Sequence, residues 1–228
     1  QVSDAAMAAA IAAIEPGATE RQVAAACHKA MIEAGGTFPG FGPFIRSTRR
    51  LGEEHTTWSD AVLAEGDAVF LELSGCVGRY HAPLGRLVHV GRLPDGTAEM
   101  AAVCQEAFGA VLAALRPGAL AREVYAAWQA VVDRAGLGHY RRHHCGYAVG
   151  IGMPPSWTGG NSVTGLRSDG DMALRSGMTF HILSWLMGAG QMGAGQGRGD
   201  YFVSDTVLLG EAGAEVLTRT PTAPTVRA

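Results

Sequence analysis

Apolar residues recur at helical spacing in two short stretches of the chain, one near its start and one near its middle. The first stripe comprises Val23, Ala26, Cys27, Ala30 and Met31, and the second comprises Val124, Ala127, Trp128, Val131 and Val132. Residues three and four apart share one helix face, so each stripe predicts an amphipathic helix packed on a core. A Pro-Gly break before each helix and a glycine after it are typical helix boundaries.

A strand-rich segment follows each helical stretch. β-branched and aromatic residues concentrate at 67–74 and 87–90 after the first stretch, and at 178–184 and 207–209 after the second. This composition and the flanking glycines favour strands that pair as hairpins.

The two halves of the chain repeat each other. Residues 15–23 (EPGATERQV) align without a gap with residues 116–124 (RPGALAREV), and one strand of each half contains Phe-x-x-x-Ser. A gapless run with Pro-Gly in register, followed by matching strands, argues against chance. The sequence therefore predicts an α+β fold, made of two pseudo-symmetric units of two helices and a β-hairpin around a central cleft.

Composition and charge remove several classes of function. The chain has 228 residues, is 47% hydrophobic and carries a formal net charge of −3, which is ordinary for a globular protein. We expect residues 1–228 to form a single domain. No cluster of Lys and Arg is long enough to indicate a nucleic-acid partner, and the densest basic stretch, 141–144, is interpreted as a solvated loop.

Cysteine spacing and hydropathy bear on the compartment. The four cysteines are far apart and form no C-x-x-C pair, so we expect no disulfides and a reducing, cytoplasmic location. No apolar run reaches membrane-spanning length, and no basic segment followed by an apolar core indicates a signal peptide. We expect no membrane partner.

Five stretches add a more specific pattern along nearly the whole chain. In order, they are 66–73 (GDAVFLEL), 79–86 (RYHAPLGR), 144–150 (HCGYAVG), 176–180 (SGMTF) and 204–218 (SDTVLLGEAGAEVLT). Together they resemble the creatinase, prolidase and methionine aminopeptidase superfamily (M24). The resemblance implies the pita-bread fold and a homodimer, and also a family N-terminal domain that is absent from this chain.

Departures from the superfamily pattern concern its metal ligands. The peptidases of the superfamily hold two metal ions with two Asp, one His and two Glu, and the matching places here hold Glu72, Pro83, Tyr147, Leu183 and Ser204. Pro and Leu side chains offer no ligand atom, and Ser and Tyr are poor ligands for Mn, Co or Zn. We therefore expect no catalytic metal and no cofactor. The stretches 71–76, 79–84, 146–157 and 177–181 are most similar to the metal-free ectoine hydrolase group.

Two residues are candidates for catalysis without a metal, which needs a base and an acid for the leaving amine. His55 matches a family position where a His acts as acid and base, and its ordinary pKa suits that role; an exposed loop His is the alternative. Glu72 lies in an apolar strand, where an unpaired carboxylate is costly to bury. It could pair with a cationic amidinium or attack it as a nucleophile, whereas simple alternation would turn it to solvent.

Four residues are candidates for substrate binding. His81 and His181 lie on predicted hairpin strands, where each could orient a substrate or satisfy a core hydrogen bond. Tyr147 could donate a hydrogen bond to a substrate carboxylate, and Trp157 is expected to form a wall of the pocket. Arg86 is expected to have a structural role by pairing within the sheet.

Three hypotheses of function follow. The first is a metal-independent hydrolase of a non-peptide C–N bond in a small amidine or amino-acid derivative, similar to ectoine hydrolase and creatinase. Gly85 stands where creatinase has a substrate-binding Glu, which argues against creatine as the substrate. The second is a metal-dependent Xaa-Pro aminopeptidase or prolidase-like peptidase, which the missing ligands oppose. The third is a catalytically inactive binding module, which His55 and Glu72 together oppose.

Overall fold

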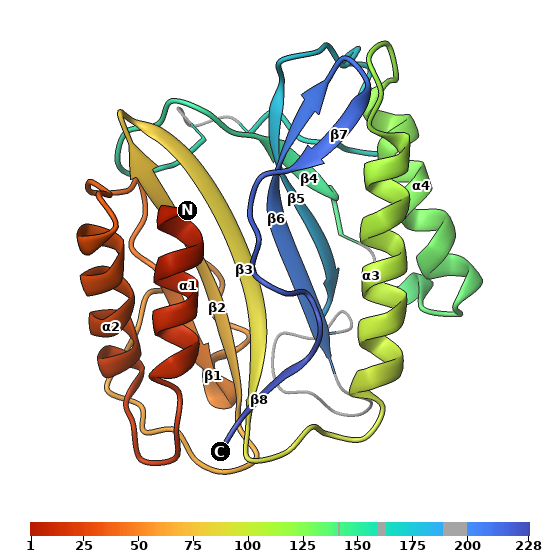
Figure 1. The fold of residues 1–228 in the computed structure, drawn as a ribbon. Helices are drawn as coiled ribbons and strands as arrows, with labels where there is room; N and C mark the ends of the chain where they lie inside the picture. The colour runs from red at the N-terminus through yellow and green to blue at the C-terminus, as the bar shows by residue number, and fades with distance from the viewer. Residues whose placement is uncertain (141, 159–162, 189–199) are drawn as a thin grey trace.

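The computed structural model describes residues 1–140, 142–158, 163–188 and 200–228 (Figure 1). Its helices are α1 (Val2–Ala12), α2 (Glu20–Glu33), α3 (Thr97–Ala114) and α4 (Ala121–Arg134), and short 3₁₀ turns lie at Thr48–Arg50 and Gly138–Tyr140. Its strands are β1 (Phe44–Ser47), β2 (Ala68–Val77), β3 (Tyr80–Val90), β4 (Gly146–Ala148), β5 (Thr179–Leu186), β6 (Tyr201–Gly210), β7 (Gly213–Val216) and β8 (Thr225–Arg227).

The strands form one sheet in the order β1-β2-β3-β6-β5-β4. Neighbours along this path pair antiparallel, β7 continues from β6, and β8 pairs parallel with β3. Helices α1 and α2 cover the β1-β2-β3 half, and α3 and α4 lie beside the other half (Figure 1). The halves meet where β3 pairs with β6, at Gly85 opposite Ser204 and Arg86 opposite Val203.

The repeat in the sequence is a repeat in space. Gly17 N–H donates to the carbonyl of Leu63, and Gly118 N–H donates to the carbonyl of Leu174, each at 2.8 Å. Both glycines have positive φ, 91° and 89°, where a side chain would strain the backbone. The predicted α+β fold, with two pseudo-symmetric halves of a helix pair and a hairpin, is confirmed.

The two second helices of the repeat begin differently. The hydroxyl of Thr19 accepts a hydrogen bond from the backbone N–H of Gln22, and the Gln22 side chain accepts one from the N–H of Thr19, which is a capping box. Helix α4 has Leu120 at the corresponding place, which has no acceptor. Only the reverse bond remains there, from Leu120 N–H to the carboxylate of Glu123 at 2.8 Å.

Alternation along the strands separates two faces of the sheet. Leu71 and Leu73 of β2 pack with α1 and α2, and Ile182 of β5 packs with α3 and α4. The intervening residues turn to the other face, where an aromatic cluster includes Phe70 and Leu183. Period two therefore places Glu72 on this second face. Alternation does not turn Glu72 to solvent, since it is only 8% exposed.

Other structural expectations were also met. All four cysteines are free and buried. Arg86 is buried and donates to Asp205 at 2.9 Å and to the carbonyls of Ser204 and Pro221, so its structural role is confirmed. None of the helices in the described ranges combines the length and the apolar character needed to cross a membrane.

Candidate functional site

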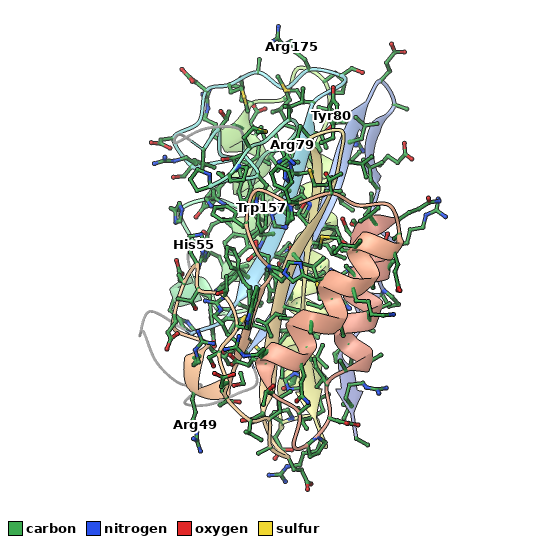
Figure 2. The ribbon with its side chains drawn as sticks, turned by 90° about the vertical axis from the view of Figure 1, so that its left-hand side faces the viewer. Arg49, His55, Arg79, Tyr80, Trp157 and Arg175 are labelled. Atoms are coloured by element: carbon green, nitrogen blue, oxygen red, sulfur yellow. The ribbon has the colours of Figure 1, made fainter. Side chains whose placement is uncertain are left out.

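A cavity of about 320 Å³ lies on the second face of the sheet. Strands β1, β2, β4 and β5 contribute to its lining, and loops carrying His55, His143 and Trp157 complete it. Figure 2 shows His55 and Trp157 on the side of the sheet away from α1 and α2. The volume is at the lower end of the roughly 300–1,000 Å³ that is typical of small-molecule sites.

Most of the predicted site residues gather at this cavity. His55, Glu72, Tyr147 and Trp157 line it, and His181 lies directly behind Tyr147. His81 does not reach it. It lines a separate cavity of about 770 Å³, and its Nε2 accepts a hydrogen bond from Gly40 N–H at 2.9 Å.

Glu72 presents its carboxyl in the middle of this arrangement. Its strand neighbours are Phe44 of β1 and Gly85 of β3. A side chain at Gly85 would meet the Phe202 ring at 2.3 Å, so this place has no room for the Glu of creatinase. Burial raises the pKa of Glu72 to about 7, although the positive charges of Arg46 and Arg142 oppose that rise. Near neutral pH the carboxyl is therefore divided between its two charge states.

A chain of buried hydrogen bonds lies beside Glu72. Trp157 Nε1 donates to the Tyr147 hydroxyl at 3.0 Å, that hydroxyl lies 2.8 Å from His181 Nδ1, and His181 Nε2 lies 2.7 Å from the Ser204 hydroxyl. Because indole N–H can only donate, Tyr147 accepts it and gives its own proton to Nδ1. His181 then donates from Nε2 to the Ser204 hydroxyl, so that both ring nitrogens have a partner.

The charge state of His181 agrees with this polarity. Burial lowers the pKa of His181 to about 3, with further lowering by the charges of His144 and Arg86. The imidazole is therefore neutral at physiological pH, and its 3.8 Å contact with Glu72 is not an ion pair. The Tyr147 hydroxyl makes hydrogen bonds to both Trp157 and His181. Its donation to a substrate carboxylate stays a prediction.

His55 reaches the cavity from a loop with an uncommon backbone conformation. Its φ is 55°, in the left-handed region that a residue with a side chain rarely adopts. The imidazole contacts the rings of Phe41 and Phe44, with centroid distances of 6.4 and 5.7 Å. Such a conformation persists only where the surrounding structure holds it. His55 thus lines the cavity from a loop position that is itself exposed, as the alternative of an exposed loop His had it.

The described part of the basic stretch 141–144 lies in a loop in which His143 is exposed, but this loop also belongs to the cavity wall. Arg142, His143 and His144 line the cavity, whereas residue 141 lies outside the described residues. Arg142 is 22% exposed at its side chain, stacks over the Trp185 ring at 4.3 Å and pairs with Glu54 at 3.1 Å. In the sequence, the feature that could have indicated this is the position of the stretch immediately before strand β4, which carries Tyr147.

Arg46 is a second basic residue that the sequence did not single out. It is 2% exposed, its guanidinium lies 4.3 Å above the Phe70 ring, and Nη1 donates to the carbonyl of Glu53. Its Nε–H has no partner among the described residues. All four residues of β1 are buried, so the strand has no alternation of buried and exposed positions that could have identified Arg46.

Four of the five places of the superfamily's metal ligands lie at or next to the cavity, but their residues do not fit a metal pair. Glu72, Tyr147 and Leu183 line the cavity, and Ser204 is joined to it through His181. Leucine offers no donor atom, and both hydroxyls already bind His181. In the parts of the chain that the structure describes, no group of three or more His, Cys, Asp or Glu side chains could hold a metal ion.

Comparison with known proteins gives a consistent picture. A model of metallopeptidase family M24 matches residues 1–211. The chain is 28% identical to an ectoine hydrolase of Halomonas elongata, over 91% of this chain and 52% of that protein. It is also 28% identical to a Xaa-Pro dipeptidase of Pyrococcus furiosus, over 96% of this chain and 59% of that protein.

Solved structures share the fold. The prolidase from Pyrococcus furiosus superposes with a TM-score of 0.83 and 27% identity, over 96% of this chain and 61% of that one. The dipeptidase PepE from Mycobacterium ulcerans gives a TM-score of 0.84 and 27% identity, over 98% of this chain and 56% of that one. The chain thus spans about half the length of the curated relatives it matches. With the family model extending over most of its residues, the chain belongs to metallopeptidase family M24.

Proposed function

We propose that the chain carries the catalytic site of a metal-independent hydrolase, which opens a non-peptide C–N bond in a small amidine or related amino-acid derivative. The observation that carries this proposal is Glu72. It is a buried carboxyl with a pKa of about 7 that lines the same cavity as His55. A titratable group that lies in a cavity and has a pKa shifted toward 7 is typical of catalytic sites.

The chemistry needs one water molecule. The ionised Glu72 pairs with the cationic amidine and so directs its electrophilic carbon into the cavity. When water adds to that carbon, His55 takes one water proton as a general base. The same proton then goes to the departing nitrogen as the C–N bond breaks. Amidine and water become an amide and an amine, with no other reactant.

The basic wall favours a substrate with an acidic group. Arg46 and Arg142 line the cavity, and both interact electrostatically with Glu72. A carboxylate next to an amidinium would meet a positive wall and a negative carboxyl at once. This pattern supports an amino-acid derivative rather than a simple amidine. The ectoine hydrolase of Halomonas elongata is a relative whose name agrees with this class.

A metal-dependent Xaa-Pro peptidase is the second candidate. The Xaa-Pro dipeptidase of Pyrococcus furiosus shares the same 28% identity with the chain as the ectoine hydrolase does. The residues at the ligand places oppose it, because a single carboxylate cannot hold two divalent ions.

The test is turnover of ectoine, hydroxyectoine and Xaa-Pro dipeptides by the purified 228-residue chain, with and without a chelator. We expect chelator-resistant ring opening, reduced about 10²–10⁴-fold in His55→Gln. Glu72→Gln should abolish it. Chelator-sensitive dipeptide cleavage would instead establish the peptidase, and absence of both turnover and ligand binding would leave the inactive binding module.

A further inference from the structure

Glu20, the first residue of α2, is a fully buried carboxylate outside the cavity. Its Oε1 accepts from the backbone N–H and the hydroxyl of Ser47, at 2.7 and 2.8 Å. Its Oε2 accepts from the N–H and the hydroxyl of Ser59, at 2.8 and 2.7 Å, and also from Arg50. One side chain thus receives five hydrogen bonds from a single stretch of chain.

These donors lie at both ends of the segment that carries His55. We define residues 47–59 as the His55 loop. Ser47 begins the loop, Ser59 ends it, and Arg50 connects Glu20 to its interior. Arg50 also donates to the Glu53 carboxylate at 2.9 Å and to the carbonyl of Thr57 at 3.1 Å, on the two sides of His55. Glu20 is therefore the common anchor of the whole loop.

The repeat shows that the fold itself does not require a carboxylate at this place. The equivalent residue of the second half is Ala121, which is also fully buried. The backbone N–H groups of both residues make the same bond, from Glu20 to Ala61 and from Ala121 to Met172, each at 3.0 Å. A small apolar residue thus completes the second half. The charge of Glu20 serves something that only the first half contains.

The first half, unlike the second, contains the His55 loop. Burial by itself would raise the pKa of Glu20, but the bonds from Ser47 and Ser59 outweigh it and hold the pKa below its ordinary value. The Glu20 carboxylate is therefore charged near neutral pH. It constrains a loop in which His55 has a positive φ, a conformation that the surrounding structure must hold.

We propose that Glu20 is a positioning residue for the reaction, which fixes the His55 loop so that the His55 imidazole stays at the cavity wall. This role rests on the proposed acid and base function of His55. Glu20 touches neither substrate nor the reacting atoms, and it acts only through the loop.

The variant Glu20→Gln tests the proposal in the complete 228-residue chain. Glutamine offers one acceptor oxygen, and its NH₂ group replaces the other. The loop therefore loses the hydrogen bonds from either Ser47 or Ser59. We expect amide hydrogen exchange of residues 48–58 to rise at least about tenfold, with exchange in β2 and β5 unchanged. We also expect kcat to fall about 10²-fold with KM nearly unchanged.

The matched control is Asp60→Asn. It removes the exposed pair between Arg21 and Asp60, which joins the same turn of α2 to the residue after the loop. We expect neither loop exchange nor kcat to change. If Glu20→Gln does not fold, Ser59→Ala removes one of the five bonds and should give a smaller change of the same kind.

Three outcomes would overturn the proposal. They are unchanged exchange in the loop, an equal rise in the loop and the sheet strands, and a mobile loop with unchanged kcat. If the wild-type chain turns over none of the substrates, the proposed function fails instead. Exchange in the loop, together with the NMR titration of the His55 imidazole in wild type and Glu20→Gln, then decides whether Glu20 holds the loop.

Discussion

Glu72 lies among aromatic and basic side chains, in a place where a carboxyl prefers to keep its proton. Its pKa of about 7 compares with an ordinary value of 4.5. The folded protein therefore binds this proton more tightly than the unfolded chain does between these two pH values. The stabilising effect is complete below about pH 4.5 and is lost as the pH rises through 7.

The variant Glu72→Gln should remove this pH dependence. A shift from 4.5 to about 7 corresponds to about 3 kcal/mol of stability lost above pH 7. We therefore expect Glu72→Gln to be more stable than wild type at pH 8 by an amount of that order, and to differ much less at pH 4.5. Urea unfolding at the two pH values measures the difference. An equal effect of the substitution at both would show that burial does not set this pKa.

At the scale of residues, the sequence identified those cavity residues that lie within a recognisable motif. Glu72, Tyr147 and Trp157 were found in this way. His81 and His181 occur in similar strand contexts, but His81 lies four residues before Gly85 along β3, about 13 Å at strand spacing. The sequence did not show at which end of β3 the cavity lies. Arg46 was missed because a four-residue strand has too little pattern to show which way a side chain points.

At the scale of elements, the two second helices of the repeat differ in their first turn. Thr19 and Gln22 close a capping box on α2, whereas α4 begins at an apolar residue. Helix α2 therefore depends more on its N-cap than helix α4 does. The difference matters for the site, because the first turn of α2 also carries Glu20.

The variant Thr19→Ala should destabilise the protein by about 1 kcal/mol, since it removes the side-chain hydroxyl that accepts from the N–H of Gln22. Chemical denaturation measures the change. Thr19→Ser, which keeps the hydroxyl, is the control and should retain most of the stability. A loss as large in Thr19→Ser would mean that the methyl group, not the cap, carries the effect.

Element prediction succeeded where a segment was long and periodic. Both helix pairs and both hairpins were predicted, although β3 and β6 begin well before the predicted stretches at 87–90 and 207–209. Strands β1, β4, β7 and β8 were not predicted. Each has only three or four residues, so its pairing is imposed by neighbouring strands rather than by its own composition.

At the scale of the whole molecule, Arg86 ties the two halves together. It lies on β3, where this strand meets β6, and its guanidinium binds Asp205 of β6 and the carbonyls of Ser204 and Pro221. Burial raises the pKa of Asp205, and the Arg86 charge works against that rise. The pair is thus a buried ionic contact whose partners depend on each other.

The variant Arg86→Met should destabilise the protein by about 3–5 kcal/mol, because it leaves the Asp205 carboxylate buried without its cation. Adding Asp205→Asn should recover part of the loss. Arg21→Met, which breaks the exposed pair with Asp60, serves as the control and should have little effect. Equal unfolding midpoints for Arg86→Met and wild type would contradict the role of Arg86 at this junction.

The cleft between the halves was predicted from the duplication, whereas the duplication did not indicate which residues line it. The internal repeat indicates where the two halves meet. The cavity, however, is lined in part by loops that have no counterpart in the repeat, such as those that carry His55 and Trp157. The sequence repeat ends before those loops, so their positions depend on tertiary packing alone.

The parallel pairing of β8 with β3 has a consequence for the order of folding during synthesis. Residues 225–227 lie against Val88 to Val90, and Asp4 accepts hydrogen bonds from the backbone of Arg219 and Thr220. A ribosome releases the first half long before these residues, so that half waits with part of β3 unpaired. The half that is made first therefore receives its last strand only when the end of the second half has been translated.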